Sequence, residues 1–343
     1  MRPVSVSRRA VLLGLAAAPL LAVLSGCAPD DPDGVAPTAA DPGTDADALP
    51  HTAPSASNPP LEDASAAVLH PLDGDTTMSV WAHYDDDLLF LDAPLVQAVR
   101  AGGRVCTVYL TGGDAGRGAE YEAGRERGIM AAYDEIRDAD GAWSRTAVRL
   151  NTGAQVDVWS PGDDDRITLV FFRLPDGSLA GTGFPSTGEV SLSKLAGGLI
   201  HDLPDLDDRY RLDWHGLIGS LQELIADFAP KSFYTHVPGT AHRLSKGDHP
   251  DHSTTGTAAH QAWRQAAVPG GAIAFAVGYQ DAAYPANVVG DALARKVSVF
   301  RAYAEDDAVT AACRDERSCL AVPRFGGWLQ REYLKSEADL ARG

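Results

Sequence analysis

Ionisable side chains that could carry out chemistry concentrate in two short segments, WAHYDDDLLF at residues 81–90 and GDHPDHSTTG at residues 247–256. Their candidate groups are three histidines and four aspartates: His83, Asp85, Asp86, Asp87, His249, Asp251 and His252. Imidazole and carboxylate are usual ligands of a catalytic zinc ion, which takes three protein ligands and keeps a fourth position open. His83, Asp86 and one histidine of the second segment would supply such a set.

Both segments also have a purely structural interpretation. Aspartates favour helix N-termini, because a carboxylate accepts hydrogen bonds from free N–H groups and faces the positive end of the helix dipole. The run Asp85–Asp87 and the pair His249 and Asp251 could therefore do no more than cap helices. Taken together, the two segments favour chemistry, because they bring a full set of metal ligands from two separate strand ends.

The intervening sequence indicates which elements position these segments. Apolar, strand-like runs alternate with amphipathic, helix-like stretches. Strands are expected at 78–83, 104–111, 167–174, 232–237 and 272–279, and helices at 93–103, 119–136, 215–229, 287–304 and directly after His252. This order predicts an α/β, Rossmann-like fold with a mostly parallel sheet covered by helices on both faces. In such sheets ligands bind at the carboxyl ends of the strands, where the first segment begins.

The two segments resemble the motifs of the PIG-L (LmbE-like) family of zinc-dependent N-deacetylases. The family motifs read AHPDDE and HPDH, and this chain carries AHYDDD and HPDH in the same order and on the same pattern of elements. The similarity extends over roughly residues 78–279. It implies one Zn²⁺ per chain, held by His83, Asp86 and His252, with Asp85 as the general base.

The residues themselves suit amide hydrolysis. Zinc lowers the pKa of water to about 7 and polarises a carbonyl oxygen, and a neighbouring carboxylate, here Asp85, can take the proton. By the resemblance, His249 would stabilise the developing oxyanion or assist the leaving amine. Asp251 could orient a neighbouring imidazole, and Asp87 could support the ligands or cap a helix.

Several positions depart from the family pattern. Tyr84 replaces the usual proline and Asp87 the usual glutamate, which keeps the implied ligands but alters the first loop. Asp114, in LTGGDAGRG, stands where the family carries a Thr-Gly-Glu-like loop, and Arg125 resembles a family arginine that contacts substrate. We therefore expect Asp114 and Arg125 to bind substrate, although Gly128 stands where a glutamate would be expected.

The N-terminal residues indicate export. Residues 1–27 carry basic residues and then an apolar run that is shorter than the roughly 20 residues needed to span a bilayer, as in a secretory signal. LSGC resembles a bacterial lipobox and SRRAVL a twin-arginine signal, so we expect Cys27 to be lipidated. An ordinary secretory signal with a chance cysteine is the alternative. Residues 28–66, rich in Pro, Ala, Asp and Ser, predict a disordered tether, and 67–343 a single domain.

These features place the protein on the extracytoplasmic face of a bacterial membrane, held there through lipidated Cys27. Cys313 and Cys319 flank RDERS in an exported chain, which predicts a disulfide between them. Cys106 lies in an apolar strand and is expected to be a buried thiol.

Charge narrows the function further. A formal net charge of −18 opposes binding to nucleic acid, which depends on clustered Lys and Arg. We predict hydrolysis of the acetamide of an N-acetylated sugar or glycoconjugate; self-association is left open. The alternatives are a metal-dependent phosphoesterase, which usually needs two metals and more carboxylates, and a catalytically inactive glycan-binding module on the same fold. Segment 176–213 is either a substrate lid or a surface excursion.

Overall fold

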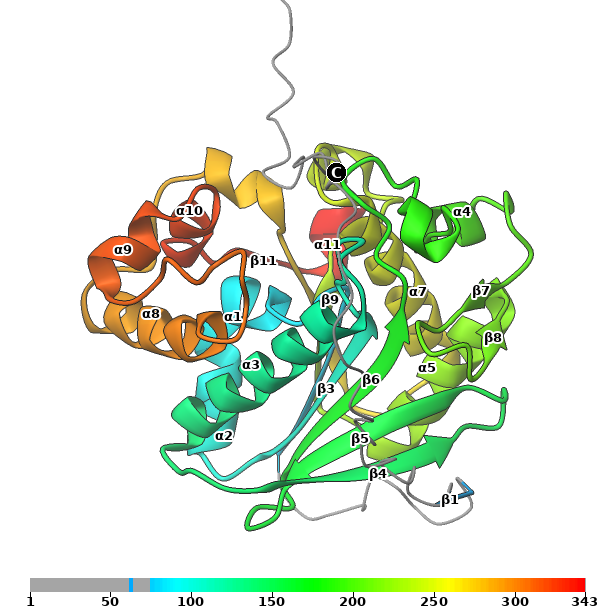
Figure 1. The fold of residues 1–343 in the computed structure, drawn as a ribbon, viewed down its shortest axis with the longest axis horizontal. Coiled ribbons are helices and arrows are strands. Elements are labelled where there is room, and N and C mark those ends of the chain that lie inside the picture. The colour runs from blue at the N-terminus through cyan, green and yellow to red at the C-terminus, as the bar shows by residue number, and fades with distance from the viewer. Residues whose placement is uncertain (1–61, 64–74, 343) are drawn as a thin grey trace, which may run out of the picture. The chain divides into compact units, whose positions relative to one another are not determined.

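The computed structural model describes residues 62–63 and 75–342, and within them a nine-stranded sheet has the order β1-β4-β5-β6-β3-β2-β9-β10-β11 (Figure 1). Its strands are β1 (Glu62–Asp63), β2 (Thr76–Trp81), β3 (Arg104–Thr111), β4 (Trp143–Arg149), β5 (Gln155–Pro161), β6 (Ile167–Leu174), β9 (Ser232–His236), β10 (Ala272–Ala276) and β11 (Leu334–Lys335). The five central strands, from β6 to β10, are parallel to one another. The predicted fold class is therefore confirmed.

Helices lie on both faces of this sheet. They are α1 (Asp86–Phe90), α2 (Asp92–Arg100), α3 (Ala119–Arg137), α4 (Leu192–Ala196), α5 (Trp214–Phe228), α6 (His242–Ser245), α7 (Pro250–Ala266), α8 (Gly290–Ala304), α9 (Glu316–Ala321), α10 (Phe325–Leu329) and α11 (Glu337–Leu340). Two short 3₁₀ turns, η1 (Pro185–Thr187) and η2 (Tyr279–Ala283), and a small hairpin of β7 (Leu203–Pro204) and β8 (Arg211–Leu212) complete the described elements.

The strand residues alternate between two cores. Met78, Val80 and Cys106 point into the core under α5 and α7, whereas Trp81 and Tyr109 point into the core under α1, α2, α3 and α8. This period of two follows from the pleat of the strand. Every residue of β2, β3 and β6 is buried, as expected for the central strands of a sheet covered on both faces.

Helix α5 shows how the sequence specifies one of these elements. The Asp213 carboxylate accepts the N–H of Gly216 at 2.7 Å and caps the first turn. The buried side chains of Leu217, Leu221 and Leu224 then recur at helical spacing and face the sheet. The helix ends at Phe228, and the next residue, Ala229, adopts a left-handed conformation.

The antiparallel part of the sheet was not predicted. β4 and β5 form a hairpin that pairs antiparallel with β6, and β11 pairs antiparallel with β10. Half-exposed strands such as β4 lack the continuous apolar runs by which the central strands are recognised. β1 lies inside the segment predicted as a tether, and pairs with edge strand β4, a contact made through backbone groups that needs no apolar side chains.

Segment 176–213 is anchored to the body of the protein. Leu192, Leu195 and Leu203 are buried in the core that contains α5 and α7. Ion pairs hold its β7–β8 hairpin: Arg209, between the two strands, donates to Asp157 of β5 at 2.9 Å and to Asp205 at 2.7 Å. The segment is therefore held in place by both apolar and ionic contacts.

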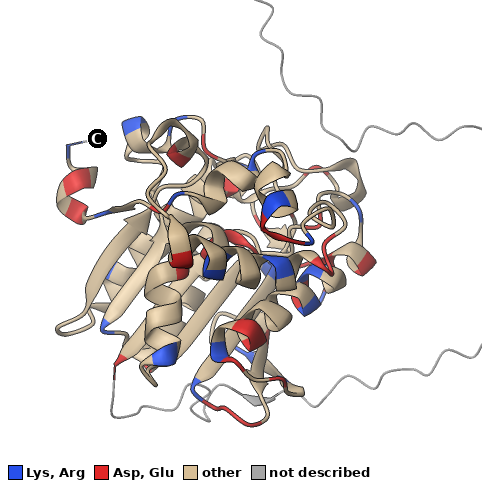
Figure 2. Ribbon diagram, turned by 90° about the vertical axis from the view of Figure 1, so that its left-hand side faces the viewer, with Lys and Arg blue, Asp and Glu red and all other residues tan. Residues whose placement is uncertain are grey.

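The export features lie outside the part that can be described. The predicted signal at 1–27 with Cys27, and the predicted tether apart from residues 62–63, lie outside the described residues, and their roles stay predictions. In the described ranges no helix combines the length and the apolar character needed to cross a bilayer. Figure 2 shows acidic and basic segments interspersed on one side of the molecule.

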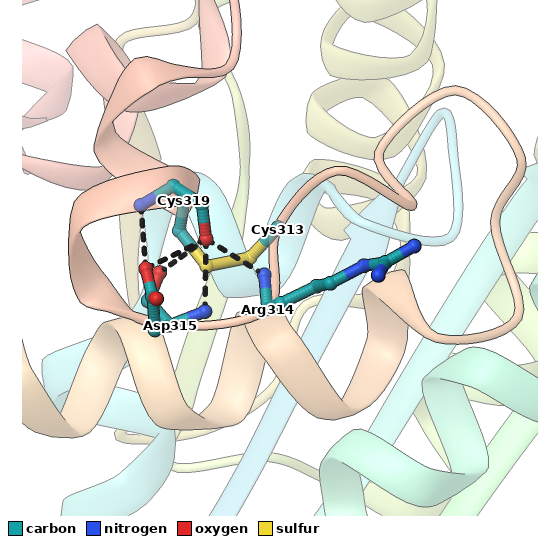
Figure 3. The surroundings of a disulfide bond; sticks show 5 residues. Cys313, Arg314, Asp315 and Cys319 are labelled. Atoms are coloured by element: carbon teal, nitrogen blue, oxygen red, sulfur yellow. Dashed lines mark hydrogen bonds between the residues drawn. A yellow bond between two sulfur atoms is a disulfide. The ribbon is translucent and has the colours of Figure 1, made fainter.

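Two of the predicted cysteine environments can be compared with the structure. Cys313 and Cys319 are joined by a disulfide next to the start of α9 (Figure 3). Asp315 caps this helix by accepting the N–H of Ser318. Cys106 is a free thiol, and burial raises its pKa to about 12. Such a thiol is unreactive at neutral pH.

Candidate active site

The two predicted segments meet because of the strand order. β2 lies between β3 and β9, and all three strands are parallel, so their carboxyl ends lie side by side. His83 follows β2 by two residues, and the loop after β9 leads to His249, which caps helix α7. This edge of the sheet is where α/β proteins bind ligands.

Candidate metal-ligand atoms of three residues converge at this edge. His83 Nδ1 lies 3.1 Å from His252 Nε2, which lies 3.1 Å from Asp86 Oδ1, and His83 Nδ1 lies 3.4 Å from Asp86 Oδ2. Ligand atoms 2.0 to 2.1 Å from a tetrahedral zinc are separated by about 3.3 Å. The three groups are buried and form one of the sets whose ligand atoms are close enough to hold a metal ion. Their arrangement therefore fits the ion that the sequence predicts.

Two neighbours that are not among the predicted site residues contact these ligands. Asp248 Oδ1 lies 2.9 Å from His252 Nδ1, and this contact directs Nε2 of the same ring toward Asp86 and His83. His236 Nε2 lies 3.0 Å from Asp86 Oδ2. Asp248 directly precedes the HPDH motif, which is a signal that could have been used, whereas His236 is one of several histidines without a motif.

The charges of the site support one another. Burial alone would raise the pKa of Asp86, but His252, His236 and His83 together hold it well below its usual range. Burial alone would lower the pKa of His252, but the carboxylates of Asp86 and Asp248 raise it to about 9. The carboxylates of Asp86 and Asp248 thus stabilise a positive charge at His252, which contacts both of them.

His249 is both a helix cap and a candidate donor. Its Nδ1 accepts the backbone N–H of Asp251 at 3.1 Å, so His249 does cap helix α7. Burial, followed by the proximity of His83, lowers the pKa of His249 to about 4. A neutral ring whose Nδ1 accepts a hydrogen bond carries its proton on Nε2. The cap therefore leaves His249 with Nε2–H as a hydrogen-bond donor.

A second group of buried side chains lies on the other side of the His83 ring. His83 Nε2 is 3.6 Å from Asp251 Oδ2 and 4.0 Å from Asp176 Oδ2. Asp251 Oδ2 also accepts the backbone N–H of Gly177 at 2.7 Å, which ties the start of segment 176–213 to α7. Asp251 thus lies beside two imidazoles, those of His83 and His249, as the orienting role predicts.

The predicted base, Asp85, has a cationic partner. Arg125 Nη2 donates to Asp85 Oδ1 at 2.7 Å, and both groups are almost completely buried. Burial raises the pKa of Asp85, and the positive charge of Arg125 opposes that rise. Asp85 stands at the N-cap of α1 but makes no side-chain capping bond, so it does not act as a helix cap.

The family model for GlcNAc-PI de-N-acetylase, PIG-L, matches residues 78–263, more than half of the chain. The chain belongs to the PIG-L family. The resemblance carried by the two motifs is thereby confirmed.

The solved structures that this PIG-L protein matches share little sequence with it. N,N'-diacetylchitobiose deacetylase from Pyrococcus horikoshii is 14% identical, with 67% of this chain and 70% of that chain covered and a TM-score of 0.39. The A40926 pseudoaglycone deacetylase Dbv21 is 17% identical, with 66% and 80% covered and a TM-score of 0.36. GalB, the 4-carboxy-2-hydroxymuconate hydratase from Pseudomonas putida KT2440, is 13% identical, with 72% and 85% covered and a TM-score of 0.39. No curated protein matches the sequence.

The residues that depart from the PIG-L motif form hydrogen bonds with other buried residues of the protein. Tyr84, in place of the usual proline, is fully buried and donates from its hydroxyl to Glu122 Oε1 at 2.5 Å. Asp87 accepts the hydroxyls of Tyr109 and Tyr133, each at 2.9 Å, and burial raises its pKa to about 7. Asp87 therefore faces the tyrosines of β3 and α3.

The two residues predicted to bind substrate have partners within the chain. Asp114 Oδ1 accepts the backbone N–H of Asp176 and Oδ2 that of Gly116, both at 3.0 Å. Arg125 donates from each of its nitrogens to a group of the protein. Asp114 shapes the loops around the site and Arg125 contacts the predicted base; their roles in binding substrate stay predictions.

Proposed function

We propose that this PIG-L protein hydrolyses the acetamide of an N-acetylated sugar or glycoconjugate in a zinc-dependent reaction. The observation that carries the proposal is the convergence of His83 Nδ1, Asp86 Oδ1 and His252 Nε2 beside a buried carboxylate, Asp85, and a neutral histidine donor, His249. These are the groups that amide hydrolysis needs: metal ligands, a base and a donor for the developing negative charge. Family membership supplies the preference for an N-acetylated sugar.

His83, Asp86 and His252 would hold the ion, which when bound polarises the amide carbonyl and makes a water easier to deprotonate. Asp85 takes a proton from the attacking water, whose oxygen forms a bond to the carbonyl carbon. The carbon–nitrogen bond then breaks as the nitrogen takes the proton that Asp85 received from the water, and the products are acetate and a free amine. Arg125 keeps Asp85 in one orientation during this exchange.

His249 acts on the carbonyl oxygen. Because its Nδ1 is occupied by the N–H of Asp251, its Nε2–H is the available donor, and burial keeps the ring neutral at pH 7. A neutral donor of this kind stabilises an oxygen on which negative charge develops.

The decisive experiment measures zinc content and acetate release for residues 57–343, the compact unit, with N-acetylglucosamine-containing substrates. Asp85→Asn should keep the metal and lose activity, whereas His252→Ala should lose both. The exposed residues His201 and Asp208 provide matched controls, His201→Ala and Asp208→Asn, that should change neither.

The alternatives predict other results. Two metals per chain with phosphate release from a phosphoester would favour a phosphoesterase. Glycan binding that persists in Asp85→Asn, with no acetate release by the wild type, would favour a binding module. Metal without hydrolysis of any amide would contradict the proposal.

We further propose that the protein acts outside the cytoplasm, anchored through a lipidated Cys27. The support is the lipobox-like LSGC sequence together with the disulfide between Cys313 and Cys319, since disulfides persist in oxidising compartments. Expression of the full chain in a bacterial host should place it in the membrane fraction, and Cys27→Ser should release it. Equal membrane association of both forms would contradict lipid anchoring.

A further inference from the structure

The side chain of Arg125 is held from several directions. Besides Asp85, its guanidinium donates from Nη1 to the carbonyl of Gly113 at 2.7 Å and from Nε to the hydroxyl of Tyr303 at 2.6 Å. Nε also lies 3.4 Å from Asp307 Oδ2. Arg125 is only 7% exposed, so these contacts determine where its charge lies.

Asp307 connects these contacts to the backbone. Its Oδ2 accepts the hydroxyl of Tyr303 at 2.7 Å, and its Oδ1 accepts the hydroxyl of Tyr121 and the N–H of Val309, each at 2.8 Å. The carboxylate is 2% exposed and Tyr303 is fully buried. A chain of buried hydrogen bonds therefore runs from Asp307 through Tyr303 and Arg125 to Asp85.

The backbone around Asp307 is itself constrained. Thr310 N–H donates to the carbonyl of Asp307 at 3.1 Å, and Cys313 N–H donates to the carbonyl of Thr310 at 2.8 Å. Cys313 is then fixed by its disulfide to Cys319 (Figure 3). Successive turns thus link the carboxylate that contacts Arg125 to a covalent cross-link.

Two glycines let this region approach helix α3 closely. A Cβ at Gly128 would lie 2.6 Å from the carbonyl oxygen of Tyr303, and a Cβ at Gly124 would lie 2.8 Å from that of Asp306. Any larger residue would push α8 and the loop after it away from Arg125, which is on the same helix. Gly128, which stands where the family pattern suggests a glutamate, therefore fits the close packing of α8.

We propose that Tyr303 and Asp307 are positioning residues that hold Arg125 so that it fixes the orientation of the base Asp85. The inference rests on the proposed function, in which Asp85 takes a proton from water. Both residues lie beyond the region 78–263 that matches the family model. The C-terminal part of this chain would therefore complete the catalytic site from outside the region that carries the motifs.

The test compares Asp307→Asn and Tyr303→Phe with the wild type. Displacing a catalytic group by about 1 Å can cost on the order of 10²-fold in rate, so kcat should fall at least about 10-fold. Zinc content should stay unchanged, because neither residue contacts the ligands of the proposed zinc site. Asp306→Asn, in the same loop and paired with exposed Arg127, is the matched control and should keep full activity.

A double-mutant cycle separates positioning from general loss of stability. In an Arg125→Ala background, Asp307→Asn should cause no further loss of kcat, because its effect is transmitted through Arg125. An equal loss in both backgrounds, or a kcat equal to that of the wild type in both single variants, would overturn the inference. If Asp307→Asn fails to fold, Tyr303→Phe decides, because it removes only a hydroxyl.

A spectroscopic measurement keeps the inference independent of the proposed function. The Nε–H resonance of Arg125 should be protected from solvent exchange in the wild type, and the protection should fall in Asp307→Asn and Tyr303→Phe. Unchanged protection would overturn the positioning role. If the wild type releases no acetate from any amide, the proposed function fails, and this measurement still decides whether Tyr303 and Asp307 hold Arg125.

Discussion

Replacement of Asp248 tests how the candidate metal site is supported. Its carboxylate accepts a hydrogen bond from His252 Nδ1 at 2.9 Å, and its side chain is fully buried. Asp248→Asn removes the charge but keeps an acceptor for the backbone N–H groups of His249 and Tyr279. The change therefore weakens the support of His252 with little disturbance of the backbone.

The expected loss can be estimated in two ways. A hydrogen bond to a charged group contributes about 1.5 to 3 kcal/mol. Loss of a group that orients a metal ligand weakens metal affinity about 10- to 100-fold, which corresponds to roughly 1.4 to 2.7 kcal/mol. The two estimates agree, so the zinc Kd of Asp248→Asn should rise about 10- to 100-fold.

Competition with a chromophoric chelator at pH 7 measures this Kd directly. Asp208→Asn, an exposed aspartate in segment 176–213, is the control and should bind zinc as the wild type does. If Asp248→Asn bound zinc with unchanged affinity, then His252 would not depend on Asp248 for its orientation. The assignment of His252 as a ligand would then lose its structural support.

Three further predictions concern stability. Asp281 is fully buried and makes no side-chain hydrogen bond among the described residues, and burial raises its pKa to about 7. Folding therefore favours the protonated carboxyl, and the free energy of unfolding falls as the pH rises from about 4 through 7. The free energy of unfolding of Asp281→Asn, measured with urea relative to that of the wild type, should therefore rise by about 2 kcal/mol between pH 4.5 and pH 8. If the difference between the two proteins were the same at both pH values, the raised pKa would be contradicted. Replacing Cys313 and Cys319 with serine should lower the free energy of unfolding by about 2 kcal/mol in the same assay, because the disulfide restricts the unfolded chain. An unchanged free energy of unfolding would contradict this stabilisation. Phe233→Ala, which removes a buried ring stacked on Trp263, should cost about 3 to 5 kcal/mol, and a loss below 1 kcal/mol would mean that this core repacks.

Several structural features were predictable from local sequence. The runs at 104–111 and 167–174 coincide with β3 and β6, because fully buried parallel strands are continuous apolar stretches. The helix expected at 119–136 is α3, which ends one residue later. The hairpin of β4 and β5 escaped prediction because its residues are only partly buried and its pairing is settled by neighbouring strands.

The sequence by itself determined the fold class, the family and the candidate groups of the site. Each of these depends on spacing within a short stretch, whether the period of a strand or the order of residues in HPDH. The tertiary structure decided which groups support the candidates: Asp248 at His252, His236 at Asp86, and Tyr303 at Arg125. Tyr303 and Arg125 are 178 positions apart, and two residues at such a separation meet only when helices pack. Local pattern specifies each element, whereas the contacts that hold Asp85 in place exist only once α3 and α8 are packed together.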